Sequence, residues 1–299
     1  MTKNTNIGKC RLCGREADIF ESHIIPKFAT DWIKETSATG YLRQATQPNL
    51  RIQDGIKTKL LCAECEELFS RLEKRFAEDL FIPFLEKGQT SFEYDDWLLS
   101  FGVSLAWRTA TYISSLTADT PPNLKPELAR FLDKAINCWR AFLLKQRKDL
   151  GPYEHHLLFL DAVRNDKGLG LPDRFNSYLL RTIGAEIAST PTEVFVYTKL
   201  PGLIFWSFVE PAHIEGLEGT YIYPRGIIAS SQKLTRVELG NFLMDRAKHA
   251  DLRVSMSPKQ RQKLANAFLK DPELTRSSHS FEVLRYDIAN QKNVNRDKG

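Results

Sequence analysis

The spacing of hydrophobic residues predicts three helices in the first half of the chain. Over residues 61–85, apolar side chains recur every four positions, at Leu68, Leu72, Phe76 and Leu80. This spacing places them on one face of an amphipathic helix, which we expect to end near Pro83 because proline interrupts a helix interior. Residues 95–117 are apolar on almost every face and predict a buried helix. Residues 121–150 open with prolines and predict another.

The second half of the chain changes to a pattern that is typical of strands. Residues 174–189, 192–211 and 220–230 are rich in β-branched and aromatic side chains, with glycine and proline between the runs. We expect three to five strands in an antiparallel sheet. Helical spacing returns over residues 235–254 and again over residues 257–271, where a Ser-Pro pair is typical of a helix start. The whole pattern predicts an α+β protein.

Two CxxC pairs mark the N-terminal part, Cys10 with Cys13 and Cys62 with Cys65. Each pair lets two thiolates reach one ion, and two pairs complete a tetrahedral four-cysteine shell. Gly14 follows the first pair, where such a knuckle turns sharply, and the second pair opens a predicted helix. The pattern predicts a treble-clef, ββα-like module with a structural Zn²⁺, because four protein ligands leave no open position for chemistry. Four unrelated thiols are the alternative.

Composition narrows the class of protein only moderately. The chain has 299 residues, is 42% hydrophobic and carries a formal net charge of +5, which is compatible with nucleic acid without requiring it. No apolar run reaches membrane-spanning length and no signal peptide is recognisable, so we expect a cytoplasmic protein without a membrane partner. The odd number of cysteines favours metal binding over a disulfide framework. Cys138 lies in an apolar helix and is expected to be a small buried side chain.

The residues between the cysteine pairs carry a resemblance to a known family. The stretches "CRLCG", "SHIIPKF", "NLRIQDG" and "LLCAECEELFS" resemble HNH-type endonucleases that have a treble-clef four-cysteine zinc module, over about residues 8–80. The resemblance implies a metal-dependent endonuclease that hydrolyses phosphodiester bonds of DNA. His23 would be the general base that activates water, a task that suits histidine because it titrates near neutral pH. Mg²⁺ or a similar divalent cation would stabilise the transition state.

The sequence departs from the family pattern at the residues that would hold this cation. Ser22 stands where the family usually has aspartate or histidine. We therefore expect the ligands to come from a wider set, namely Glu21, Asn49, Asp54, Glu66 and Glu73. Each has an ordinary alternative, because the asparagine and aspartate lie in turn sequences. Glu66 and Glu73 could simply be solvated helix charges that pair with Arg71, Lys74 or Arg75.

Other candidate residues also have alternatives. His23 could be a packed histidine bonded to a backbone carbonyl, or a zinc ligand that replaces a cysteine. Four basic residues of the N-terminal part could contact a phosphate backbone, namely Lys27, Arg51, Lys57 and Lys59. His155 and His156 are interpreted as structural residues of a helix, since adjacent helical side chains point about 100° apart and rarely share a metal.

We predict a division into an HNH-like zinc module over residues 1–95 and an α+β domain over residues 96–299. The second part shows no recognisable catalytic constellation. A second hypothesis is therefore a catalytically degenerate zinc protein that binds nucleic acid, or a protein partner through its C-terminal part. A third is a structural zinc module that serves an unrelated enzyme, which would require a deep polar pocket in the C-terminal part.

Overall fold

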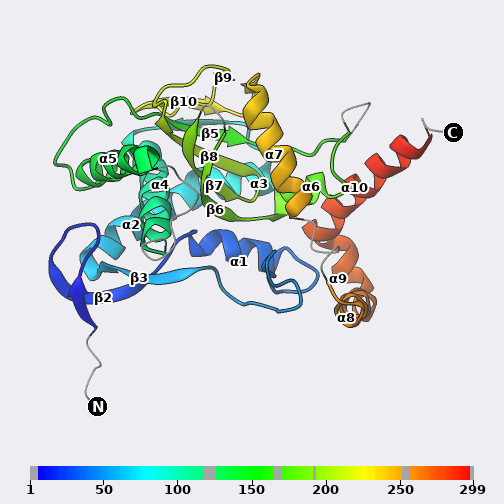
Figure 1. The fold of residues 1–299 in the computed structure, drawn as a ribbon. Coiled ribbons are helices and arrows are strands. Elements are labelled where there is room, and N and C mark those ends of the chain that lie inside the picture. Colours follow the sequence, from blue (N-terminus) through cyan, green and yellow to red (C-terminus); the bar gives the residue numbers. More distant parts are fainter. Residues whose placement is uncertain (1–5, 117–125, 165–169, 191–192, 251–255, 297–299) are drawn as a thin grey trace, which may run out of the picture.

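The computed structural model describes residues 6–116, 126–164, 170–190, 193–250 and 256–296 (Figure 1). Its helices and antiparallel sheets confirm the predicted α+β class.

The N-terminal strands and the helix that follows them form the predicted ββα-like unit. Strands β1 (Ile7–Lys9), β2 (Glu16–His23) and β3 (Lys57–Cys62) form an antiparallel sheet in the order β1-β2-β3. Helix α2 (Ala63–Phe76) leaves directly from the end of β3, and α1 (Lys27–Glu35) follows β2 after a short turn. The register between β2 and β3 shifts between Phe20 and Glu21, because Leu60 of β3 is an extra residue without a partner in β2.

The helical stretch does not end at Pro83 as predicted. A π-helical segment, η1 (Ala77–Phe81), follows α2 and leads into α3 (Ile82–Lys87), which has the proline in its first turn. Proline is tolerated there because the first residues of a helix need no backbone donor. Gly88 ends α3 in a left-handed conformation (φ 65°).

Helix α4 (Asp96–Leu116) confirms the predicted buried helix, since every residue from Trp97 to Ala110 except Ser100 is buried. Even so, no helix within the described residues is both long and apolar enough to cross a membrane. Helix α5 (Pro126–Leu143) confirms the helix predicted over residues 121–150, but it ends seven residues before the predicted end. The predicted start at residues 121–125 lies outside the described residues.

The central sheet is antiparallel, as predicted, and the strands lie in the order β5-β8-β7-β6. Their bounds are His155–Phe159 for β5, Gly184–Ser189 for β6, Val194–Leu200 for β7 and Leu203–Glu210 for β8.

Two local predictions for this region were wrong. Residues 175–181 form helix α6 (Phe175–Arg181) instead of a strand, because their buried side chains pack on a helix face rather than on a sheet. His155 and His156 lie in strand β5 instead of a helix. They point to opposite faces and bond separate partners, Ser207 Oγ at 2.7 Å and Thr220 Oγ1 at 2.8 Å.

Short strands and C-terminal helices complete the fold. Two antiparallel pairs are β4 with β10 and β9 with β11, over Ser91–Tyr94 with Gly226–Ala229 and Leu217–Glu218 with Lys233–Leu234. The remaining helices are α7 (Val237–His249), α8 (Pro258–Lys270), α9 (Pro272–Ser277) and α10 (His279–Arg296). The first two confirm predicted helices, although residues 251–254 of the first prediction lie outside the described residues.

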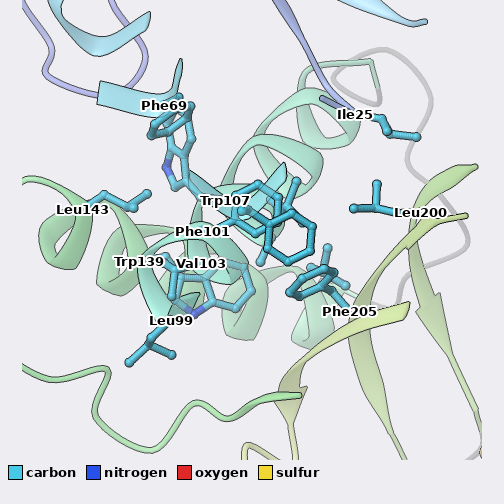
Figure 2. Packing of buried hydrophobic residues seen from close by; sticks show 14 of the residues in the cluster. Ile25, Phe69, Leu99, Phe101, Val103, Trp107, Trp139, Leu143, Leu200 and Phe205 are labelled. Atoms are coloured by element: carbon cyan, nitrogen blue, oxygen red, sulfur yellow. The ribbon is translucent and has the colours of Figure 1, made fainter. Parts of the chain in front are cut away.

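The main hydrophobic core lies around α4, between α2 and the central sheet (Figure 2). Phe101 of α4 stacks on Phe76 of α2 with ring centroids 4.0 Å apart, and its edge meets Phe205 of β8 at 5.6 Å. Trp107 of α4 meets Phe69 of α2 at 5.9 Å. Residues from both sides of position 95 therefore share one core, and the predicted division into two domains at that point stays a prediction.

Lys199 of β7 carries a buried amino group within the second half of the fold. Its side chain is buried, and Nζ donates to the carbonyls of Leu179 at 2.6 Å and Leu200 at 3.2 Å. Burial lowers the pKa of Lys199 to about 7. Between this value and the ordinary lysine pKa near 10.5, the unfolded chain binds more protons than the folded one. The contribution of Lys199 to the free energy of unfolding therefore rises with pH through this window.

When the pH is raised from 7 to 9, we expect the free energy of unfolding of wild type to increase by about 2 kcal/mol more than that of Lys199→Met. Urea denaturation of both proteins at the two pH values measures this gain. Methionine removes the titrating group, while effects of pH elsewhere cancel in the difference. Parallel pH dependences of the two proteins would contradict the prediction.

Candidate metal centre and histidine site

The four predicted cysteines come together in one cluster. The Sγ atoms of Cys10, Cys13, Cys62 and Cys65 all lie within 4.8 Å of one another, and those of Cys13 and Cys62 are 3.8 Å apart. A tetrahedral ion with Zn–S bonds of about 2.3 Å separates its sulfur atoms by about 3.8 Å, so the donor set fits zinc in both chemistry and size. The cluster is a candidate structural zinc site, as predicted.

Local backbone geometry holds the first cysteine pair in a tight knuckle. Gly14 donates its N–H to Cys10 O at 2.9 Å and takes a left-handed conformation (φ 80°), in which a side chain would be strained. Arg11 N–H donates to Leu60 O at 3.0 Å and ties the knuckle to β3. The N–H of Cys62 points at Cys10 Sγ, 3.4 Å away. The turn and the start of α2 therefore bring the two pairs together.

Arg15 supports the thiolate of Cys13. Its Nε donates to Cys13 Sγ at 3.5 Å, and its guanidinium also pairs with Glu64 in the first turn of α2. Burial opposes ionisation of Cys13, but the bonds from Arg15 and from neighbouring cysteines lower its pKa to about 6. A thiolate at neutral pH is the form that binds zinc.

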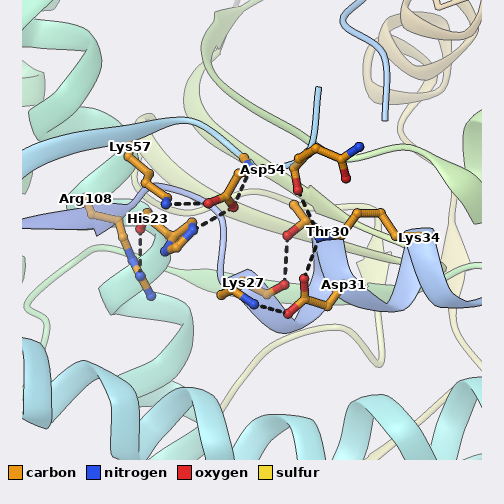
Figure 3. Close-up of polar contacts among 10 residues, drawn as sticks. His23, Lys27, Thr30, Asp31, Lys34, Asp54, Lys57 and Arg108 are labelled. Carbon is orange, nitrogen blue, oxygen red and sulfur yellow. Dashed lines mark hydrogen bonds and ion pairs between the residues drawn. The ribbon is translucent and has the colours of Figure 1, made fainter. Parts of the chain in front are cut away.

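His23 lies at the end of β2 and is bonded to Asp54 (Figure 3). Its Nε2 is 2.9 Å from Asp54 Oδ1, and the ring is 19% exposed. Asp54 also accepts the N–H of Gly55 at 2.8 Å and pairs with Lys57. Burial opposes ionisation of Asp54, but the bonds from Lys57, His23 and Gly55 hold the pKa of its carboxyl well below the usual range. The imidazole therefore faces a carboxylate that stays ionised.

Helix α1 holds the loop that delivers Asp54. Lys34 Nζ donates to Gln53 O at 2.9 Å and pairs with Asp31 one turn earlier on the helix, as Figure 3 shows. Gly55 packs so closely that a side chain there would approach Thr30 Cγ2 to 3.2 Å. Pairing of β2 with β3 sets His23 opposite Lys57, so a strand and a helix-bound loop together determine the pair.

Glu66 lies on the other side of the end of β2. Ser22 is buried, and its hydroxyl donates to Glu66 Oε1. Burial raises the pKa of Glu66, against the attraction of Arg108 and His23. Ser22 stands at the sequence position where the HNH-type pattern has a metal ligand. In this structure its hydroxyl bonds the carboxylate of Glu66 on α2 instead.

Arg108 of α4 is a residue of the site that sequence reasoning missed. Its side chain is 2% exposed, and Nη1 donates to His23 O at 3.0 Å and to Glu73 Oε1 at 2.6 Å. Its guanidinium also covers the ring of Phe69 at 5.0 Å. A single arginine within the apolar run of residues 95–117 was the available signal, since a buried cation requires a partner. Arg108 joins α4 to the backbone of the candidate base.

The predicted cation ligands do not converge as a set. Glu21 is exposed and pairs across the sheet with Lys59, and Asn49 Oδ1 accepts the N–H of Ser257 at 2.8 Å, away from His23. Glu66 bonds Ser22, and Glu73 bonds Arg108, instead of the predicted cations of their own helix. Within the described residues, the cysteine cluster is the one group of three or more His, Cys, Asp or Glu side chains placed to hold a metal.

The predicted basic residues lie at different places around this site. Lys57 pairs with Asp54, and Lys27 pairs with Asp31 at 2.5 Å on α1. Lys59 Nζ donates to Asn6 Oδ1 at 2.7 Å, and Arg51 covers the ring of Tyr41 at 4.3 Å. A role in nucleic-acid contact stays a prediction for all four.

A cavity of about 560 Å³ lies between α2 and the β4–β10 pair, lined by Arg75, Glu93, Tyr94, Asp95, Arg225, Gly226 and Ile227. Arg75 and Asp95 pair across it at 3.0 Å. Because Arg75 of α2 forms part of its lining, this cavity is not confined to the C-terminal part, and the third hypothesis stays a prediction.

No family model, curated protein or solved structure matches this chain. The zinc site therefore depends on its own geometry, and the HNH-type resemblance depends on the motif residues alone.

Glu73→Ala is expected to lower the free energy of unfolding by about 3 kcal/mol, because it leaves the buried Arg108 without its carboxylate. Urea denaturation in the presence of zinc measures the loss. Glu67→Ala on the same helix is the matched control, since Glu67 is 71% exposed and pairs with Arg71 at 3.7 Å. We expect this control to stay within about 0.5 kcal/mol of wild type. Equal effects of the two substitutions would show that the buried pair does not stabilise the fold.

Proposed function

We propose that the chain is a metal-dependent endonuclease of HNH type that hydrolyses phosphodiester bonds of DNA, with His23 as the general base. The observation that carries the proposal is the bond between His23 Nε2 and Asp54, at the end of β2 in a zinc-binding ββα unit. A base whose ring is oriented by a carboxylate is a recurrent arrangement for activating a nucleophile.

The chemistry assigns a role to each nitrogen of the His23 ring. Because Nε2 donates its proton to Asp54, Nδ1 carries the lone pair and would accept a proton from water. The water oxygen then forms a bond to phosphorus, while the bond from phosphorus to the leaving ester oxygen breaks. Asp54 holds the ring in this tautomer and stabilises the imidazolium that forms. Lys57 adds a positive charge beside the pair, where a phosphate would approach.

A divalent cation fits this proposal as a group that binds with the substrate. Mg²⁺ commonly uses only one or two protein carboxylates, together with water and substrate phosphate oxygens. Asp54 is the residue that would hold it beside His23, since its carboxylate bonds the ring, whereas Glu66 bonds Ser22 on the other side of β2. The cation would stabilise the charge that develops on the phosphate.

Cleavage of supercoiled plasmid with Mg²⁺ or Mn²⁺, and with EDTA as the control, tests the proposal. We expect nicked and linear products that depend on the divalent ion. Parallel reactions with single-stranded DNA and RNA identify the substrate class. Absence of cleavage of every substrate, by protein that carries one zinc ion per chain, would overturn it.

A second candidate is a catalytically degenerate zinc protein that binds nucleic acid or a protein partner. The hydrogen bonds of the acidic side chains favour it, because the carboxylate of Glu66 is bonded to Ser22 and that of Glu73 is bonded to Arg108. Binding of nucleic acid without cleavage would support this candidate.

A further inference from the structure

Helix α8 carries a row of cations that nothing in the described chain neutralises. Its sequence, "PKQRQKLANAFLK", contains four basic residues and no acidic one. All four are exposed, and none forms an ion pair with another described residue: Lys259, Arg261, Lys263 and Lys270. Basic residues elsewhere in the fold commonly pair with acidic ones, such as Lys27 with Asp31. This helix therefore presents a positive surface.

Three of these cations share the outer face of the helix. At 100° per residue, Lys259, Lys263 and Lys270 lie within about 40° of one another and span about 16 Å along the axis. The amides of Gln262 and Asn266 lie on the same side and bond each other at 2.9 Å. The partly buried side chains of α8 are on another face, at Gln260, Leu264, Ala267 and Phe268. A row of this length fits a ligand with regularly repeated negative charges better than a single phosphate group.

The helix is attached to the loop that delivers Asp54. Ser257, which caps α8, donates its N–H to Asn49 Oδ1 at 2.8 Å, and Arg43 Nη2 donates to Gln260 Oε1 at 3.4 Å. Figure 1 shows α8 beyond the far end of α1, beside this loop. Asn49 and Asp54 are five residues apart, so their Cα atoms are at most about 18 Å apart.

Two arginines of the loop extend the positive surface toward the site. Arg43 and Arg51 both cover the ring of Tyr41, at 5.2 Å and 4.3 Å, which holds both guanidinium groups close to one side chain of the loop. Neither forms an ion pair with another described residue, whereas Lys57 next to His23 is paired with Asp54. The cations of α8 and of the loop thus lie on two segments that are bonded to each other at Asn49 and Arg43.

We propose that the outer face of α8, with Arg43 and Arg51, binds the phosphate backbone of a nucleic acid whose scissile bond lies at His23. This inference rests on the proposed function and names the surface that holds its substrate. Contacts of this kind are independent of sequence and weaken steeply with salt. The surface would place several phosphates on one side of the cleaved bond and position the strand for attack.

The test is fluorescence anisotropy of the full-length protein with a labelled 30-base-pair DNA duplex, in EDTA so that binding is measured without cleavage. The variant K259Q/K263Q/K270Q should bind at least about tenfold more weakly at 100 mM salt. Its slope of log K against log salt should be shallower by about 2 to 3, near 0.9 for each lost phosphate contact. The control K87Q/K134Q/K248Q removes the same charge from exposed lysines elsewhere and should stay within about twofold of wild type.

Two outcomes would overturn the inference. Equal binding by the two triple variants would assign the affinity to net charge, and absence of wild-type binding to duplex DNA, single-stranded DNA and RNA would exclude a nucleic-acid surface. Vesicles with 30% phosphatidylserine form a further arm, and binding that depends on α8 there but not on DNA would identify a membrane contact instead. If wild type binds DNA without cleaving it and the α8 variant loses this binding, the nuclease proposal and the scissile bond at His23 are refuted, while α8 remains the nucleic-acid surface.

Discussion

Replacement of His23 by alanine is expected to lower the rate of metal-dependent DNA cleavage by at least about 100-fold. General base catalysis by a positioned side chain commonly contributes 10²- to 10⁴-fold. Alanine removes the group that would accept the proton of water and leaves Asp54 with Lys57 as its partner. The measurement is the initial rate of plasmid nicking under single-turnover conditions with Mn²⁺ or Mg²⁺, for wild type and variant.

The controls separate a lost base from a damaged fold. His249→Ala removes a histidine that is exposed at the end of α7, and its rate should equal that of wild type. The zinc content and the unfolding midpoint of His23→Ala should stay close to wild type, since among the described residues the ring bonds the side chain of Asp54 alone and the backbone bond from Arg108 remains. Full activity in His23→Ala would remove the base from the mechanism, whatever the origin of the cleavage.

Loss of zinc is expected to unfold the N-terminal ββα-like unit. Zinc bound by four thiolates contributes about 10 kcal/mol or more to the folding of small zinc modules. Here the ion would join the knuckle of β1 and β2 to the start of α2. We expect Cys62→Ser to lose the ion and amide exchange to accelerate in β2, β3 and α2, measured by elemental analysis and hydrogen-exchange mass spectrometry.

Cys138→Ser is the matched control for this experiment. Cys138 is also buried, but its Sγ lies against Leu150 O and Arg147 of the C-terminal part, outside the cluster. This variant should keep one zinc ion per chain and the exchange pattern of wild type. A chain that keeps zinc after Cys62→Ser, or that exchanges as slowly without zinc, would contradict a structural role for the ion.

The His23 site lies between the cysteine cluster and α4, which links the two predictions. β2 carries His23 at one end and continues the knuckle of Cys10 and Cys13 at the other. Arg108 of α4 then fixes the carbonyl of His23. We therefore expect activity to disappear with zinc even though the ion takes no part in the chemistry.

Local sequence patterns were sufficient for the elements that are determined by nearby residues. The spacing of CxxC pairs specifies a four-thiolate site, because ligand chemistry and tight turns act over a few residues. The apolar run of α4 and the periodic face of α2 predicted helices correctly, since burial follows helical periodicity. The strands β7 and β8 were predicted from their β-branched and aromatic residues.

Predictions were wrong where tertiary packing overrode local preference. Residues 175–181 are helical, and the histidines at 155 and 156 lie in a strand, because each segment packs against distant elements that a short window does not contain. Pro83 sits inside a continuous helical stretch because a π-helical segment gives it a new first turn.

By itself, the sequence of this protein determined the zinc ligands, the α+β class and the choice of His23 as the candidate base. Only the tertiary structure decided the partners of that base. Asp54 is 31 residues from His23 and Arg108 is 85 residues from it, and both reach it through packing of a loop on α1 and of α4 on α2. The tertiary structure likewise decided where the charge of α8 lies, because Asn49 bonds α8 to the loop that carries Asp54. Contacts between distant segments depend on the sum of many weak packing energies, which no local pattern of residues records.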